Sequence, residues 1–195
     1  MNWMKKVAVA LVCLLPLGLQ AAKVDTLQVK SPSMNKSIEV VVVSPDVAAT
    51  KACPVIYLLH GYGGNARTWV GIKPDLPKIA DEKGIFFVCP DGKNTWYWDS
   101  PLNADVRYET FISNELVKYV DSHYKTVADR KGRAITGLSM GGHGAMWNGL
   151  RHSDVFSAAG STSGGVDIRP FPKNWEMSVQ IGEKAKYRSE EHTSE

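Results

Sequence analysis

Apolar runs and alternating segments divide the chain into six strand-like stretches. Two of them alternate or are β-branched and are separated by turn residues, which predicts an N-terminal antiparallel hairpin. Short, fully apolar runs further along are typical of buried parallel strands. The six predicted strands are residues 24–30, 37–44, 55–59, 85–89, 133–136 and 156–161.

Between the later strands, the spacing of apolar residues predicts helices at 75–83, 108–123 and 142–151. Asp75 is the expected N-cap of the first helix, and Gly84 is its expected stop. Strands that alternate with helices after an initial hairpin predict an α/β fold with a mostly parallel sheet. A length of 195 residues fits one domain.

The composition is that of an ordinary globular protein, with 44% hydrophobic and 22% charged residues. A net charge of +3 is too small to indicate binding to nucleic acid or to an anionic membrane. The sequence contains no metal-ligand cluster, phosphate loop or dinucleotide fingerprint, so we expect neither a metal nor another cofactor.

The first 22 residues have the organisation of a secretory signal peptide. Met1 to Lys6 is short and positive, 7–19 is almost wholly apolar, and small residues follow, with cleavage expected after Ala22. The apolar run of about 13 residues is too short to span a bilayer comfortably. We therefore expect an exported protein, periplasmic or extracellular, that is not held in a membrane after cleavage.

Two cysteines remain after this leader, Cys53 and Cys89. Cys53 precedes one predicted strand and Cys89 ends the next, so strand geometry separates them by roughly 15–20 Å. A disulfide needs Cα atoms within about 7 Å. Both are predicted to be free, buried thiols.

The last eight residues, 188–195, read Arg-Ser-Glu-Glu-His-Thr-Ser-Glu. This is a codon-for-codon translation of a common short-read sequencing adapter, AGATCGGAAGAGCACACGTCTGAA. We expect an artefact here, the other interpretation being a polar tail. The predicted domain is then 23–187, a partial domain whose last strands and helices are missing.

Ser139 is the candidate nucleophile. It lies in Gly137-Leu138-Ser139-Met140-Gly141, after a predicted strand and before a predicted helix, which is the order of a nucleophile elbow. Any Cβ at Gly137 or Gly141 would crowd so tight a turn. The other interpretation is a strand-to-helix turn in which the serine is only an N-cap.

Two backbone N–H groups are expected to form the oxyanion hole. One belongs to Met140, directly after the serine. The other belongs to Tyr62, in the glycine-rich turn after strand 55–59, although Gly61 or Gly63 could supply it instead.

The long loop 93–107 carries two candidate pocket residues, Trp96 and Trp98, which could stack on a sugar or an aromatic acyl group. Alternatively, these rings seal the core.

Three segments, YLLHGYGGN, WYWDSP and RAITGLSMGGHGA, resemble the esterase D-like branch of the α/β-hydrolases. This branch includes S-formylglutathione hydrolases, tributyrin-type, feruloyl and acetyl-xylan esterases, and mycolyltransferases. The resemblance covers roughly 33–165. It implies the α/β-hydrolase fold and a serine esterase that acts on small-molecule or carbohydrate esters, with its nucleophile at Ser139 and oxyanion amides at Tyr62 and Met140.

The catalytic acid and histidine of this fold follow the serine in the chain. The candidates after Ser139 are His143, His152, Asp154 and Asp167, and none is well placed; His192 lies in the suspected adapter. The 195-residue chain is therefore expected to fold poorly and to be inactive, although its parent is a hydrolase. An acyltransferase, a prolyl-oligopeptidase-like peptidase and a dead carbohydrate-binding scaffold are the alternatives. The acyl group, the alcohol and the oligomeric state stay open.

Overall fold

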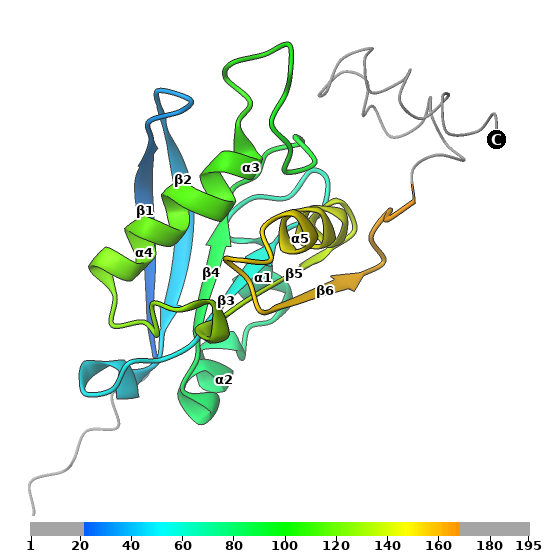
Figure 1. Cartoon of the computed structure of the whole chain (residues 1–195). Coiled ribbons are helices and arrows are strands. Elements are labelled where there is room, and N and C mark those ends of the chain that lie inside the picture. Colours follow the sequence, from blue (N-terminus) through cyan, green and yellow to red (C-terminus); the bar gives the residue numbers. More distant parts are fainter. Residues whose placement is uncertain (1–21, 168–195) are drawn as a thin grey trace, which may run out of the picture.

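The computed structural model describes residues 22–167. They form a six-stranded sheet in the order β1-β2-β4-β3-β5-β6 (Figure 1). The strands are β1 (Lys23–Ser31), β2 (Lys36–Ser44), β3 (Val55–Leu59), β4 (Phe86–Pro90), β5 (Arg133–Leu138) and β6 (Ala158–Thr162). Residues 1–21 of the leader and the suspected adapter segment lie outside the described residues.

The sheet is antiparallel at one side and parallel through the rest. β2 pairs antiparallel with both β1 and β4, whereas β4, β3, β5 and β6 run parallel. The N-terminal hairpin and the mostly parallel α/β sheet are therefore confirmed. Parallel strands place their carboxyl ends at one edge of the sheet, where ligands bind in such folds.

Helices cover both faces of the sheet. They are α1 (Thr68–Ile72), α2 (Leu76–Lys83), α3 (Tyr108–Thr110), α4 (Leu116–His123) and α5 (Met140–Arg151), and a π-helical turn, η2 (Phe111–Glu115), joins α3 to α4; η1 (Asp46–Ala49) and η3 (Arg130–Gly132) are single 3₁₀ turns. Figure 1 shows α4 and α5 crossing the same side of the sheet. None of the helices in the described part of the chain has the length and apolar character that membrane crossing requires.

Two apolar clusters fill the space between the sheet and its helices. The larger one packs η2, α4 and the start of α5 against β2, β3 and β4, with Phe111, Leu116 and Tyr57 fully buried. The smaller one packs α2 against the other face through Leu76 and Ala80. Such two-sided burial explains why the central strands are almost wholly apolar.

The helix predicted at 75–83 is confirmed, and Gly84 ends it in a left-handed conformation (φ 64°, ψ 46°). Asp75 occupies the N-cap position as predicted, and its carbonyl accepts from the Ile79 N–H over 3.0 Å, but its carboxylate pairs with Lys73 over 2.8 Å instead of capping the helix. Cys53 and Cys89 are both free and buried, as predicted. Burial raises the pKa of each thiol, so both remain protonated and inert at neutral pH.

Candidate active site

Ser139 lies in the turn between β5 and α5 and is exposed. Its backbone has φ 54° and ψ −117°, a conformation that non-glycine residues rarely adopt. Its N–H donates to the Thr162 carbonyl over 2.8 Å, and its carbonyl accepts from the His143 N–H over 3.0 Å. These contacts hold a strained elbow with the serine at the carboxyl edge of the sheet, as strand–serine–helix motifs of this kind require.

The two glycines of the motif have no room for a side chain. A Cβ at Gly137 would lie 2.2 Å from the Gly141 carbonyl oxygen, and one at Gly141 would lie 2.2 Å from the Leu59 carbonyl oxygen. Non-bonded atoms do not approach this closely, so α5 rests directly on β5 and on the end of β3. The prediction that Cβ atoms would crowd the turn is confirmed.

The glycine-rich turn after β3 lies beside the nucleophile. A Cβ built on Gly61 would be 3.5 Å from the Ser139 Cβ and 3.3 Å from the Leu138 carbonyl oxygen. Tyr62 follows Gly61 in this turn, and Met140 is the first residue of α5. The structure therefore brings together the segments that carry the predicted oxyanion amides. Which amides receive the charge stays a prediction.

The His60 side chain, which the sequence analysis did not single out, fixes the geometry of this turn. It is 1% exposed. Its Nε2 accepts from the Gly92 N–H over 2.9 Å, so the proton is assigned to Nδ1, which donates to the Gly61 carbonyl over 2.7 Å. The Gly64 N–H donates to the same carbonyl over 3.0 Å.

The Gly61 carbonyl and the Tyr62 N–H belong to one peptide plane. The chain has no cis peptide bond in its described part, so the two groups point in opposite directions. By holding the carbonyl, His60 and the Gly64 N–H set the direction of the Tyr62 N–H. The position of His60, directly before Gly61-Tyr62-Gly63-Gly64, is the signal in the sequence that could have identified this role.

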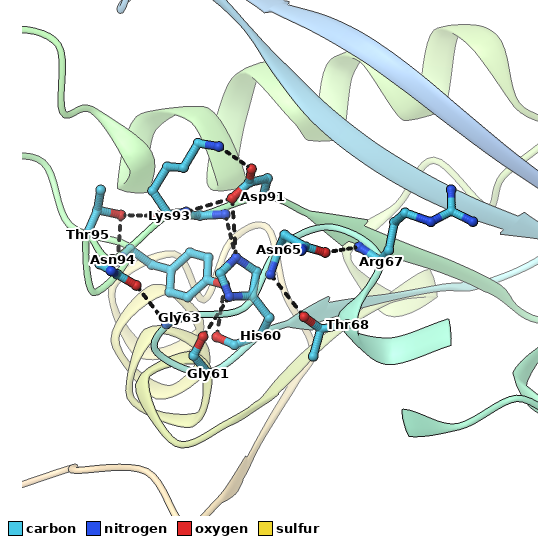
Figure 2. A network of polar contacts seen from close by, with 12 residues as sticks. His60, Gly61, Gly63, Asn65, Arg67, Thr68, Asp91, Lys93, Asn94 and Thr95 are labelled. Carbon is cyan, nitrogen blue, oxygen red and sulfur yellow. Dashed lines mark hydrogen bonds and ion pairs between the residues drawn. The ribbon is translucent and has the colours of Figure 1, made fainter. Parts of the chain in front are cut away.

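The loop after β4 supports the same turn, as Figure 2 shows. The Asn94 Oδ1 accepts from the Gly63 N–H over 2.8 Å. Asp91 is 5% exposed and accepts from the Lys93 ammonium over 2.6 Å and from the Lys93 backbone N–H over 2.9 Å. Burial raises the pKa of Asp91, but the His60 ring, whose Nε2 lies 3.5 Å from the Asp91 Oδ1, and the two Lys93 donors outweigh burial and hold the pKa at about 2. Asp91 is therefore a carboxylate at neutral pH.

Trp96 and Trp98 are buried rather than exposed, with 5% and 4% of their surface accessible. Their rings stack on each other at 6.1 Å between centroids and surround the His143 ring, which lies 4.7 Å from Trp98. The loop folds against α5 and buries both rings, and their role as pocket residues stays a prediction. The alternative, that the rings seal the core, describes their packing.

None of the histidines in the described range hydrogen-bonds to the Ser139 side chain. His143 lies in the first turn of α5, where its Nδ1 contacts the Gly165 carbonyl at 2.6 Å, and burial lowers its pKa. The His152 Nε2 contacts Glu109 at 2.9 Å. Asp154 is exposed. His192 lies outside the described residues. Within residues 22–167, the structure thus places Ser139 beside the oxyanion segments, and no histidine of this range hydrogen-bonds to its side chain.

Glu109 anchors the far end of α5. It is 8% exposed and accepts from the Trp147 Nε1 and the Arg151 Nε, each over 2.8 Å, as well as contacting His152. Burial raises the pKa of Glu109, but these hydrogen bonds outweigh burial and lower it. Among residues 22–167, no group of three or more His, Cys, Asp or Glu is arranged to hold a metal ion.

A serine on a strained strand-to-helix elbow, beside a glycine-rich turn at the carboxyl edge of a mostly parallel sheet, defines an α/β-hydrolase. The comparison with protein families agrees with this class. The chain belongs to the Esterase family, whose model matches residues 31–194.

Among curated proteins, the chain is similar to Esterase Rv1288 of Mycobacterium tuberculosis, with 30% identity over 149 residues, 73% of this chain and 32% of that protein. It is also similar to the diacylglycerol acyltransferase/mycolyltransferase Ag85A of Mycobacterium leprae, with 32% identity over 158 residues, 74% of this chain and 44% of that protein. The chain thus spans less than half the length of these relatives. A solved ferulic acid esterase superposes with a TM-score of 0.69 and 29% identity, covering 87% of this chain and 71% of that one.

Proposed function

We propose that this protein hydrolyses carboxylic esters through an acyl-enzyme on Ser139. Membership of the Esterase family supports the reaction class. The observation that carries the choice of nucleophile is the strained Ser139 backbone, held beside the Gly61-Tyr62 turn. Strain of this kind persists where the surrounding structure enforces it, and it is common at active sites.

In the proposed mechanism, the Ser139 Oγ attacks the ester carbonyl carbon and its proton passes to a base. The negative charge that develops on the carbonyl oxygen is stabilised by the N–H groups of Tyr62 and Met140. The tetrahedral intermediate then expels the alcohol, which takes up the proton and leaves the acyl group on Ser139. Water, deprotonated by the same base, attacks the acyl carbon, releases the acid and restores the serine.

The base and its orienting acid are proposed to lie outside the described residues. None of the four described histidines hydrogen-bonds to the Ser139 side chain. His60 and His143 contact backbone groups, His123 contacts Tyr119 and Ser122, and His152 contacts Glu109. A serine without its base loses orders of magnitude in rate.

The test uses the longest open reading frame that contains this sequence. With p-nitrophenyl acetate, Ser139→Ala should lower kcat/KM by about 10³-fold or more. Ser153→Ala, at an exposed serine remote from the elbow turn, is the matched control and should stay within about twofold. Rapid quenching and peptide mass spectrometry should place the acetyl group on Ser139. Retained turnover in Ser139→Ala, or an acetyl group on another residue, would refute the nucleophile.

A second candidate function is acyl transfer, supported by the similarity to the acyltransferase/mycolyltransferase of Mycobacterium leprae. The same acyl-enzyme would then be attacked by a sugar hydroxyl instead of water. Product analysis with and without a sugar acceptor separates the two reactions: an acylated sugar indicates transfer, and free acid alone indicates hydrolysis. We further propose export, on the strength of the leader-like segment before the domain.

A further inference from the structure

The Tyr62 N–H, one of the two proposed oxyanion donors, belongs to a peptide plane whose two neighbouring planes are both held by side chains. In the plane before it, the His60 carbonyl accepts from the Tyr97 hydroxyl over 3.1 Å. In the plane after it, the Gly63 N–H donates to the Asn94 Oδ1 over 2.8 Å (Figure 2). Both of these side chains come from the loop that follows β4.

These two contacts fix the position of the middle plane. Each peptide plane ends at the Cα atom where the next plane begins, so the flanking planes hold the Cα atoms of Gly61 and Tyr62. The line between these two atoms is the axis about which the middle plane can turn. The His60 ring, which holds the Gly61 carbonyl over 2.7 Å, sets the angle about this axis. Tyr97 and Asn94 therefore control where the Tyr62 N–H lies, and His60 controls where it points.

The Tyr97 side chain is fully buried and closely surrounded. A Cβ on Gly92 would lie 2.1 Å from its ring, and one on Gly144 would lie 2.5 Å from it, so the ring packs directly against the loop after β4 and against α5. This helix begins at Met140, whose N–H is the other proposed oxyanion donor. Burial raises the pKa of Tyr97 well above its ordinary value, so the hydroxyl stays protonated and can donate.

The backbone is strained where the loop delivers this ring. Trp96 and Tyr97 have φ angles of 58° and 61°, in the left-handed region that residues with side chains rarely adopt. The Tyr97 N–H donates to the Thr95 hydroxyl over 3.3 Å, and this hydroxyl donates to the Gly92 carbonyl over 2.6 Å. The Asn148 Nδ2 donates to the Tyr97 carbonyl over 3.3 Å. Strain at two successive residues persists where such contacts enforce it, and it is common at functional sites.

We propose that Tyr97 and Asn94 are positioning residues of the oxyanion hole, which act through the Tyr62 N–H and not by touching the substrate. This inference rests on the proposed esterase function and adds two residues to it. Loss of a whole oxyanion donor costs about 100- to 1000-fold in kcat, and a displacement of about 1 Å costs up to about 100-fold. Removal of one of the two supports, with the donor still present, should cost about tenfold.

The test uses the longest open reading frame that contains this sequence and p-nitrophenyl acetate as the substrate. Tyr97→Phe removes the hydroxyl and keeps the ring, and Asn94→Ala removes the acceptor. Single-turnover quenching gives the rate of Ser139 acetylation and the Kd of the ester separately. In each variant the rate should fall by about tenfold while the Kd stays within about twofold, because the oxyanion forms only in the transition state.

A trifluoromethyl ketone gives a second measurement that loss of packing alone would not change. The Ser139 Oγ adds to its carbonyl carbon, the serine proton passes to the base, and the ketone oxygen becomes an oxyanion. The Ki of this ketone should rise in each variant by about the factor by which the acetylation rate falls, because both depend on the same N–H group. All assays are made at a temperature at which near-UV circular dichroism shows the variants to be folded.

Tyr57→Phe and Asn103→Ala are the matched controls. The Tyr57 hydroxyl is buried in β3 and has no hydrogen-bond partner in the described part of the chain. Asn103 lies in the same loop as Asn94, but its Oδ1 accepts from the Asp105 N–H instead of holding the turn after β3. Both controls should keep the acetylation rate and the Ki within about twofold of the parent.

Failure of this inference is distinguishable from failure of the esterase proposal. A folded Tyr97→Phe or Asn94→Ala protein that acetylates Ser139 within about twofold of the parent rate would overturn the role of that residue. A slower rate with an unchanged Ki would overturn it too, since the defect would then lie outside the oxyanion hole. A parent protein that carries no acetyl group on Ser139 would instead refute the nucleophile itself, and the positioning roles would fall with it.

Discussion

Replacing Gly141 by alanine tests whether the elbow depends on direct contact between α5 and β3. The new Cβ would lie 2.2 Å from the Leu59 carbonyl oxygen, 2.5 Å from the Leu59 carbonyl carbon and 2.6 Å from the His60 carbonyl oxygen. All three are backbone atoms at the end of a central strand, so no flexible side chain can move aside. The helix itself must shift away from the sheet.

The size of the effect follows from this geometry. Overpacking of a well-filled core costs about 1–3 kcal/mol when side chains absorb it. Here only backbone atoms lie close enough to move aside, so we expect Gly141→Ala to lower the free energy of unfolding by about 3 kcal/mol or more. For a domain of this size, that corresponds to a fall in Tm of roughly 6–12 °C. A displacement of about 1 Å at the serine would also lower kcat by about 100-fold.

Gly71→Ala is the matched control. Gly71 is exposed in α1, and a Cβ there meets no atom within 4 Å. Alanine favours helix over glycine by about 1 kcal/mol, so this variant should be neutral or slightly stabilising. Urea unfolding and thermal scans of the two variants and the parent protein give the comparison. A Gly141→Ala protein within about 0.5 kcal/mol of the parent, a change typical of innocuous surface positions, would refute the contact argument.

Three further predictions concern other parts of the chain. The pKa of Asp91 in the folded protein, about 2, lies below the ordinary 3.8, so the ionised carboxylate should add on the order of 2 kcal/mol to the free energy of unfolding above about pH 4. This contribution is lost as the pH falls through 2, so the difference in urea stability between the parent and Asp91→Asn should shrink over the same range. A difference that does not change with pH would contradict the prediction. Glu109→Ala leaves the Trp147 indole N–H without its acceptor and should lower the free energy of unfolding by about 2–4 kcal/mol. Arg151→Ala removes a half-exposed partner of the same carboxylate and should lower it by less than about 1 kcal/mol. Equal effects of the two variants in thermal unfolding would contradict the central role of the Glu109 carboxylate. If the protein is exported, N-terminal sequencing should give Lys23 first, because cleavage is expected after Ala22, and a first residue of Ala22 would contradict that cleavage site.

The strands and the elbow were predictable because their signals are local. The β-branched and apolar runs of β2, β3 and β4 place each strand to within about one residue of its observed bounds, and the order of strands and helices is also correct. The spacing of Gly137, Ser139 and Gly141 predicted both the turn and its crowding. These features depend on a few neighbouring residues, so tertiary packing reinforces them.

Other features depend on contacts between distant segments, which a single sequence does not reveal. The short helix α1 has too few residues for a periodic pattern, and nothing in 108–123 indicates the π-helical turn η2. The aromatic residues of the 93–107 loop are visible in the sequence, but their burial depends on Gly144, where a Cβ would lie 2.5 Å from the Tyr97 ring. The orienting role of His60 depends in the same way on Gly92, 32 residues further along.

The hydrogen bond from the Ser139 N–H to the Thr162 carbonyl links the nucleophile to the mobility of β6. This strand pairs with β5 on one side; no other strand in the described range pairs with it, and most of its residues are exposed. A strand bound on one side opens more often than a central one, and each opening of its end frees the Ser139 N–H and relaxes the elbow. Amide hydrogen exchange at Ser139 would therefore report the opening rate of β6. Any segment that pairs with the free side of β6 would slow this exchange and would hold the serine in its reactive conformation for a larger fraction of the time.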